Sequence, residues 1–398
     1  MRSQASLRQG VIGMWPLLTL AALVLSIVLI SAFLTDDIQQ TVTYTLVELI
    51  VVVGLYMFVG NSGVLSFGHM SFMAIGAYTA ALLTIPINMR RIILPQFPHL
   101  LAGVELPTIP AIILGALLAA LVALVVAVPL MRLSGIAASI ATFAFLVVVQ
   151  VVISNSDSVT HGTGTLLGMP MDTTMFGAAG WALLAIATAF IFQESALGLR
   201  LRASREDEVA AKAVGINVAR ARLVAFVISA FFVAIGGALY GHLFGSIIPD
   251  AFYLSMTFVT IAMLVIGGVN SLSGAVIGTV VFSALGEMLR RIEEGVNLGL
   301  IQVPSRPGLR EVALAAIMLI ILLFRPSGLT GGKEIYWPWK KTYMRAGSEV
   351  LVSVSADPDQ ETTSESSENQ FVRLGPPATD ADDQEMSPRR PAMKEEDQ

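Results

Sequence analysis

Few residues in this sequence have the types and spacing that covalent chemistry needs. The chain contains no cysteine, so disulfides, thiol catalysis and cysteine-based metal sites are excluded. Its four histidines are His69, His99, His161 and His242; they show no metal-ligand spacing, and no H-E-x-x-H motif occurs. An enzyme with His69 or His242 as general base would need a nucleophile or metal set at recognisable spacing, which is absent. The sequence therefore argues against an enzyme.

A second set of polar residues interrupts long apolar stretches. Glu48 lies in the middle of one stretch, and the block Gly60–His69 joins two others. Polar groups inside a membrane are costly, so they mark either helix contacts or a solute pathway. A helix broken at such a block can hold a carboxylate at its N-terminus and an ammonium group on its freed carbonyls. The predicted pathway residues are Glu48, Asn61, Ser66, His69, Asn270 and Ser271.

Glycines in the same blocks have a second interpretation, because small residues let membrane helices approach closely. The block Gly267–Gly274 has the same chemistry as Gly60–His69 and faintly echoes it, as an internal transporter repeat would. The glycines assigned to helix packing or helix breaks are Gly60, Gly63, Gly68, Gly267, Gly268 and Gly274.

The elements that position these residues follow from composition. Of the 398 residues, 55% are apolar and 13% are charged, whereas a soluble domain carries about 25% charged residues. Such a chain cannot cover a water-facing surface, so lipid must be the solvent for much of it. The predicted fold class is all-α, a polytopic membrane helix bundle.

Ten segments are long and apolar enough to be candidate spans, since a helix needs about 20 residues to cross the hydrocarbon. The expected number of spans is eight to ten, because the last segment is short and the Gly267–Gly274 turn could be re-entrant. The first segment is expected to be an uncleaved helix. The segments are residues 11–34, 38–59, 64–85, 107–130, 135–154, 177–193, 222–244, 254–269, 273–289 and 311–324.

Charge predicts orientation and a separate tail. With ten spans and the N-terminus inside, 14 Lys and Arg fall in cytosolic segments against 6 outside, which favours both termini in the cytosol. Residues 1–345, the predicted transmembrane domain, carry 20 Lys and Arg against 16 Asp and Glu. Residues 346–398 carry 4 against 13 and are expected to be a disordered acidic tail. No concentrated basic face suggests nucleic-acid binding.

The stretch Ser204–Asn217 lies in the longest and most basic of the predicted cytosolic loops. Ser204 with Asp207 three residues on matches a capping box, so a helix is expected to begin there. Gly215 is expected to end it in the left-handed conformation, with Ile216 packing behind. A helix of about ten residues, about 15 Å long, cannot span a membrane. It is either an amphipathic surface helix or a docking helix for a cytosolic partner.

Five stretches together resemble the branched-chain amino-acid permease family of ATP-binding-cassette importers. The resemblance covers about residues 40–330 and is closer to the longer of the two permease types. The stretches are Gly60–Tyr78, Arg132–Gly135, Ala203–Asn217, Ile266–Gly274 and Leu323–Leu329. The chain departs from the family pattern in the smaller side chains of Ile136–Phe143 and in the acidic tail.

The resemblance implies a non-catalytic permease in a bacterial inner membrane. Its implied partners are a second homologous permease, two cytosolic ATPases that bind ATP and magnesium, an extracytoplasmic solute-binding protein, and membrane lipid. The chain itself has no G-x-x-x-x-G-K-[ST] motif for phosphates. Residues 200–222 match the family's coupling segment. Within it the predicted ATPase-coupling residues are Ser204, Arg205, Glu206, Asp207, Glu208, Ala210, Ala211, Gly215 and Asn217.

Two alternatives to amino-acid import stay open. A permease of the same family could carry urea, short amides or small organic acids, and no residue discriminates among these solutes. An ion-coupled secondary transporter would need acids within the membrane, for which Glu48 and Glu287 are the candidates.

Overall fold

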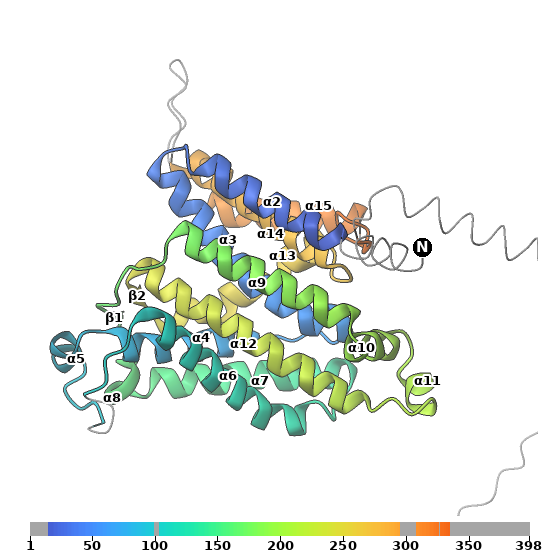
Figure 1. Cartoon of the computed structure of the whole chain (residues 1–398), viewed down its shortest axis with the longest axis horizontal. Helices are drawn as coiled ribbons and strands as arrows, with labels where there is room; N and C mark the ends of the chain where they lie inside the picture. The colour runs from blue at the N-terminus through green and yellow to red at the C-terminus, as the bar shows by residue number, and fades with distance from the viewer. Residues whose placement is uncertain (1–14, 99–102, 295–307, 326, 335–398) are drawn as a thin grey trace, which may run out of the picture. The chain divides into compact units, whose positions relative to one another are not determined.

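The computed structural model describes residues 15–98, 103–294, 308–325 and 327–334. The predicted acidic tail lies outside these residues. Each of the ten predicted apolar segments corresponds to a helix, and together they form the bundle in Figure 1. These helices are α2 (Trp15–Ser31), α3 (Asp36–Ser62), α4 (His69–Thr84), α6 (Thr108–Leu130), α7 (Gly135–Ser154), α9 (Met175–Glu194), α12 (Val218–Phe244), α13 (Leu254–Gly267), α14 (Leu272–Glu294) and α15 (Leu309–Phe324).

Short elements gather at the two ends of the bundle. At one end, on the right in Figure 1, lie α10 (Ala196–Glu206) and α11 (Glu208–Ala213); we name this the coupling end. At the opposite end lie α5 (Ile87–Ile93), α8 (Asp157–Thr160) and the antiparallel pair β1 (Leu166–Leu167) and β2 (Ser246–Ile247). The 3-10 helix η1 (Pro249–Phe252) leads into α13.

The described residues form a multi-pass membrane protein. Seven of their helices are long and apolar enough to cross a membrane, and the α4–α5 pair, bent by 118°, would be an eighth. Two further apolar helices, α2 and the middle of α15, are shorter. By length and composition the lower bound of the expected eight to ten is reached only if the α4–α5 pair counts as one span.

Helix α12 packs against α3, α4 and α6 in the core. Small residues allow this: a Cβ added at Gly237 would lie 2.0 Å from the Met73 carbonyl oxygen, and one at Gly76 would lie 2.3 Å from the Ala234 carbonyl oxygen. On the other side, a Cβ at Gly236 would lie 2.4 Å from the Val51 side chain. Since lipid gives helices no hydrophobic reason to associate, such close backbone contacts supply much of the packing.

We predict that Gly237→Ala destabilises the bundle, because the new methyl group meets the α4 backbone rather than a movable side chain. Overpacking of this kind costs about 1–3 kcal/mol. Gly180→Ala is the matched control, since a Cβ at Gly180 in α9 meets nothing within 4 Å and gains helix propensity. Thermal unfolding of the detergent-purified chain measures both; equal midpoints for the two variants would contradict the packing role.

Candidate functional site

The coupling segment contains two short helices rather than one. Ser195 begins α10 by accepting a hydrogen bond from the Gly198 amide (3.2 Å). Asp207 is in extended conformation and begins α11, where its carboxylate accepts from the amides of Val209 (2.8 Å) and Ala210 (2.9 Å). Charged Asp is a strong N-cap, so the break between the helices falls at Asp207.

The prediction that Ser204 begins the helix is therefore wrong. Ser204 is buried in the last turn of α10, and its hydroxyl donates to the Leu201 carbonyl (2.7 Å). The Ser-x-x-Asp spacing imitated a capping box, but the residues from Ala196 onward already form a helix. The hydroxyl is used within that helix, and Asp207 takes the capping role.

The predicted end of the helix is confirmed. Gly215 has φ +84°, its amide donates to the Lys212 carbonyl (3.0 Å), and the Ile216 amide donates to the Ala211 carbonyl (3.0 Å). This pair of hydrogen bonds defines a Schellman motif. Asn217 then caps α12 by accepting from the Arg220 amide (3.0 Å).

Surface exposure divides the predicted coupling residues into three groups. Exposed are Glu206, Asp207, Ala210, Gly215 and Asn217. Arg205 and Glu208 are half-buried, and Ser204 and Ala211 are buried. Two residues that the sequence analysis did not single out, Val209 and Val214, are 79% and 77% exposed. Exposed aliphatic side chains on a polar helix pair are a recognisable sign of a docking surface.

Glu208 fastens α11 to the bundle. Its carboxylate accepts from Lys212 (2.8 Å) and from Arg222 (2.9 Å), whose side chain is nearly buried. The hydrogen bond from Lys212, followed by that from Arg222, lowers the pKa of Glu208 below its ordinary value of 4.5. The ion pair thus holds α11 on α12.

The glycine block at the end of α3 turns the chain back into α4. Gly63 has φ +70°, and a Cβ at Gly68 would lie 2.6 Å from the Thr142 carbonyl oxygen. Asn61, Ser66 and His69 are all buried. His69 Nδ1 lies 2.8 Å from Ser66 Oγ, and its ring packs among Phe58, Phe72 and Phe226.

Two buried atoms of this block, Asn61 Oδ1 and His69 Nε2, have no hydrogen-bond partner within the described part of the chain. Buried polar atoms are normally paired, and exceptions call for an explanation such as water or function. The pathway role of Asn61, Ser66 and His69 stays a prediction; in this conformation their side chains are enclosed by protein.

The second glycine block forms the turn between α13 and α14. Gly268 has φ +120°, and a Cβ at Gly267 would lie 1.9 Å from the Gly274 carbonyl oxygen. Ser271 caps α14 by accepting from the Gly274 amide (3.0 Å). The Glu334 carboxylate accepts from the amides of Leu272 (2.7 Å) and Ser273 (3.1 Å). Glu334 and Ser271 thus occupy the helix N-terminus that an anionic solute would otherwise use.

Arg205 brings the two glycine blocks together. Its Nη1 donates to the Gly60 carbonyl (2.7 Å) and to Asn270 Oδ1 (3.1 Å), and its stem packs against Gly63. The side chain therefore points into the bundle, and its predicted role in ATPase coupling stays a prediction. The contacts with residues 60 and 270 could not be seen in the sequence.

A cavity of about 570 Å³ lies between α3, α12, α13, α14 and α15, toward the end opposite the coupling end. Glu48 lines it and accepts a hydrogen bond from Ser283 Oγ (2.8 Å). Glu287 also lines it and forms ion pairs with Arg290 (2.8 Å) and Arg291 (2.9 Å). The remaining lining is hydroxyl-bearing, aromatic and aliphatic: Thr41, Tyr44, Thr45, Tyr240, Ala251, Ser255, Met256, Phe258, Val259, Ala262, Met263, Phe282, Ser283, Gly286, Leu314, Ala315 and Met318.

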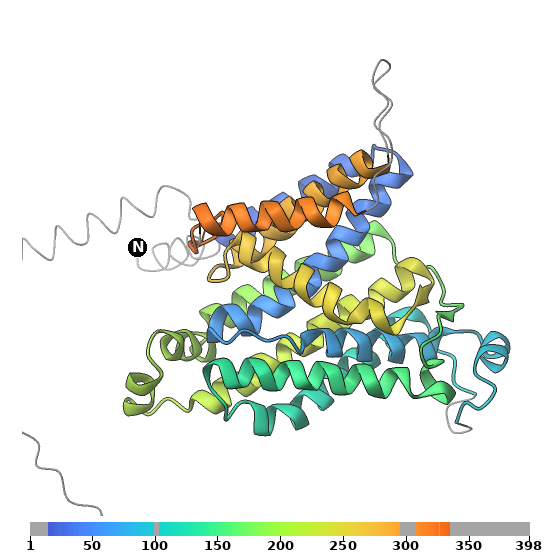
Figure 2. The same cartoon turned by 180° about the vertical axis from the view of Figure 1, so that it is seen from behind.

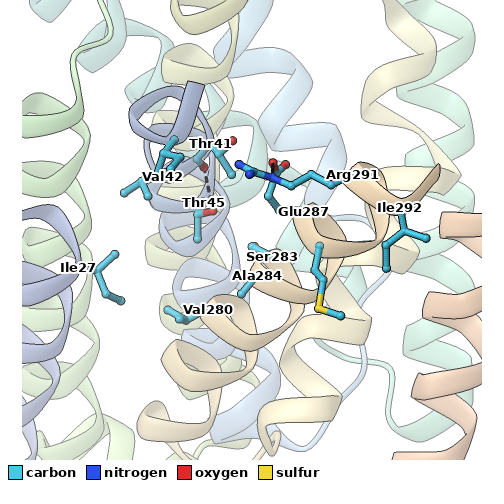
Figure 3. Close-up of a pocket in the computed structure, with 12 residues that line it drawn as sticks. Ile27, Thr41, Val42, Thr45, Val280, Ser283, Ala284, Glu287, Arg291 and Ile292 are labelled. Carbon is cyan, nitrogen blue, oxygen red and sulfur yellow. Dashed lines mark hydrogen bonds and ion pairs between the residues drawn. The ribbon is translucent and has the colours of Figure 1, made fainter. Parts of the chain in front are cut away.

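A second cavity, of about 700 Å³, lies on the other side of the α3–α14 contact and is mostly apolar (Figure 3). It is lined from α2 by Ile27, from α3 by Thr41 and Thr45, and from α14 by Glu287 and Arg291, among others. Figure 3 shows Arg291 and Glu287 beside each other at its edge. Both cavities share Thr41, Thr45, Ser283 and Glu287, so these side chains form the wall between them.

A multi-pass helical bundle with a cavity lined by two carboxylates toward one end and a pair of short helices at the other has the organisation of a membrane transporter. Residues 38–323 match the family described as "Branched-chain amino acid transport system / permease component", and the chain belongs to this family. It is therefore a transport permease component.

Three named relatives agree with this assignment. The high-affinity branched-chain amino acid transport system permease protein LivM of Escherichia coli (strain K12) is 25% identical over 322 residues, 72% of this chain and 68% of that protein. LivH of the same organism is 31% identical over 158 residues, 38% of this chain and 46% of LivH. A probable LivM from Methanocaldococcus jannaschii is 31% identical over 165 residues, 40% of this chain and 48% of that protein. No solved structure matches the chain.

We predict that Glu208→Gln lowers stability by about 1–2 kcal/mol at neutral pH, because it leaves the nearly buried Arg222 with a weaker partner. The folded pKa of Glu208 is below 4.5, so the carboxylate's contribution is complete above pH 4.5. It disappears as the pH falls through the lowered folded value.

Thermal unfolding of wild type and Glu208→Gln at neutral and acidic pH measures this difference. Glu194→Gln is the control, since Glu194 forms a longer, exposed pair with Arg202 (3.7 Å), which is worth little. A gap between Glu208→Gln and wild type that persists unchanged in acid would refute the assignment.

Proposed function

We propose that this chain is the permease subunit of an ATP-driven importer of branched-chain amino acids. The observation that carries the proposal is the 570 Å³ cavity, which combines carboxylates with an aliphatic and thioether wall. A carboxylate favours an ammonium group, and residues such as Met256, Met263 and Leu314 favour a branched aliphatic side chain. Family membership and the names of LivM and LivH support the same solute class.

The partners proposed for this permease follow from two features: the sequence has no G-x-x-x-x-G-K-[ST] motif, and α11 has an exposed face. A second, LivH-like permease would complete the pathway, and two cytosolic ATPases would bind ATP and magnesium. An extracytoplasmic binding protein would deliver the solute. The membrane would be the bacterial inner membrane, with the coupling end and both termini in the cytosol, as the Lys and Arg distribution favours.

Alternating access is the proposed mechanism. Closure of the ATPases on ATP would displace α11, and α12, joined to it by the Glu208–Arg222 ion pair (2.9 Å), would move with it. The bundle would then close around the cavity and open at the coupling end. Transport needs two such states that ATP binding populates differently.

The cavity also bears on the alternative solutes. Small organic acids are disfavoured beside Glu48, whose carboxylate lines the cavity, because like charges repel. Urea and short amides lack the ammonium group that a carboxylate would select. Ion coupling remains testable directly: uptake that survives collapse of the ion gradient but stops on ATP depletion excludes it.

We predict that Glu48→Gln raises the KM for leucine uptake about tenfold or more, since a hydrogen bond to a charged group is worth about 1.5–3 kcal/mol. The measurement is radiolabelled leucine uptake into vesicles that contain the whole reconstituted complex. Glu194→Gln, an exposed carboxylate on α9, should leave the KM unchanged. An unaltered KM in Glu48→Gln would remove Glu48 from the pathway, whereas a wild-type complex without ATP-dependent leucine uptake would overturn the proposed function.

We also predict that Val209→Asp or Ala210→Trp prevents ATPase binding, because a charge or a bulky ring would then stand on the exposed face of α11. Co-purification of the ATPases with the permease measures binding, and immunoblotting of membranes checks that the variants are present. Val209→Ile keeps the apolar surface and should bind normally. Full ATPase binding by Val209→Asp would assign α11 to the membrane surface instead.

A further inference from the structure

We infer that Arg205 is a latch that holds the coupling end of the bundle closed. The inference rests on the proposed transport function but concerns a role that neither docking nor solute binding describes. One guanidinium group links α10, the end of α3 and the turn between α13 and α14. We class Arg205 as a positioning residue, since it acts through the helices it joins.

The chemistry of the α3 end explains why an arginine is suited to this place. The last carbonyls of a helix have no partner within the helix, and Gly60 supplies one of them two residues before α3 ends at Ser62. Arg205 Nη1 donates to this carbonyl (2.7 Å). A cation at a helix C-terminus is also favoured by the helix dipole. The bond therefore satisfies a group that would otherwise need water.

The same Nη1 reaches Asn270 Oδ1 at 3.1 Å, while Nε and Nη2 donate to Glu206 Oε1 at 3.1 and 2.8 Å. The planar fork of arginine can make these bonds in several directions at once, which a lysine ammonium on a flexible stem cannot reproduce. The Arg205 side chain is 21% exposed and that of Glu206 is 73% exposed. A docked partner would thus reach Glu206 first and Arg205 through it.

Glycines make room for the latch. A Cβ at Gly63 would lie 2.5 Å from Arg205 Cγ, and Gly63 has φ +70°. A Cβ at Gly60 would lie 2.7 Å from the Val269 carbonyl oxygen. The end of α3 therefore meets both the arginine stem and the α13–α14 turn through backbone, which brings the two helix ends within reach of one guanidinium group.

The two joined elements also line the cavities. Helix α3 carries Thr41, Thr45 and Glu48, and α14, which begins two residues after Asn270, carries Ser283 and Glu287. Helix α14 packs against α3 (Figure 2), and the cavity-lining residues of α3 lie in its first half, away from its Ser62 end. With Arg205 in place, the two helices are tied at one end and enclose solute space toward the other. Release of the latch is the change that lets the coupling end open.

Asp207 connects Arg205 to α11, the helix on which the ATPases would act. It follows Arg205 by two residues and begins α11, the helix with the exposed Val209 and Val214. The extended conformation at Asp207 separates the docking helix from the latch by a single non-helical residue. Because only this residue separates the two helices, a movement of α11 would be passed on to Arg205.

The test measures the separation of the coupling-end elements in the full chain reconstituted in lipid nanodiscs. Because the sequence has no cysteine, spin labels at Val214→Cys and Lys333→Cys report one distance by pulsed electron resonance. Arg205→Ala should broaden the distribution toward longer distances, and Arg205→Lys should restore it in part. Arg200→Ala, at an exposed arginine on the same helix, should leave it as in wild type.

Two further variants separate a latch from a merely structural residue. Asn270→Ala should broaden the distribution as Arg205→Ala does, but less. Asn270→Asp adds a charge opposite the guanidinium, so it should narrow the distribution and slow uptake by the reconstituted complex. Arg205→Ala should lower uptake about tenfold, the scale of one lost charged hydrogen bond, while ATP hydrolysis continues. Helix α11 would still move with α12 through the Glu208–Arg222 pair, but it would no longer act on the end of α3 and the α13–α14 turn.

The outcomes are distinguishable. Distances in Arg205→Ala and Asn270→Ala that match wild type would overturn the latch, as would loss of uptake and of ATP hydrolysis together in Arg205→Ala. The distance measurement needs no partner subunit, so it stands even if the wild-type complex shows no ATP-dependent uptake. A wild-type complex without ATP-dependent uptake would count against the proposed function but not against the latch.

Discussion

Close contact between the α12 backbone and its neighbours is the constraint on which the rest of the bundle depends. Gly236 and Gly237 are adjacent, so they face in different directions around the helix, one toward α3 and the other toward α4. In lipid, helices gain stability from such fits and not from the expulsion of water. The position of α3 relative to α4 is therefore set by their contacts with α12. The blocks at their ends can then carry irregular backbone without loosening the core.

The two ends of α3 have opposite properties because of this arrangement. Its middle is anchored on α12, where Ser229 Oγ donates to the Gly54 carbonyl (2.6 Å). Toward Asp36 it borders open space on both sides through Thr41 and Thr45. Toward Ser62 its polar residues are enclosed and its Gly60 carbonyl accepts a hydrogen bond from Arg205. A single helix thus connects the cavity-lining region with the proposed coupling region.

Much of the fold could be predicted from the sequence, because membrane spans are encoded locally. Hydropathy located ten helices, and Gly215 marked the end of α11 since only local backbone geometry decides a Schellman motif. The prediction that Ser204 begins the helix was wrong because the capping pattern, although local, does not say which of two nearby cap residues is used. The charged Asp207 took that role.

Long-range pairings could not be predicted. Arg205 and Gly60 are 145 positions apart, and Glu48 and Ser283 are 235 positions apart. Because a polar group in a membrane needs a partner, the residue types predicted that these side chains are paired. A single sequence does not say which partners the packing supplies. Glu334 was missed altogether, because a single carboxylate in a turn carries no pattern. The pathway and docking roles of the predicted residues remain predictions.

Glu334 attaches the segment after α15 to the rest of the bundle. The Thr330 amide and hydroxyl both donate to the Gly267 carbonyl, and the Glu334 carboxylate binds the first residues of α14. Residues 327–334 therefore act as a strap across the α13–α14 turn. Tension applied to the chain beyond Glu334 would load the start of α14 first, next to Asn270. At the coupling end, the α13–α14 turn is thus held by two separate contacts, one from Arg205 and one from residues 327–334.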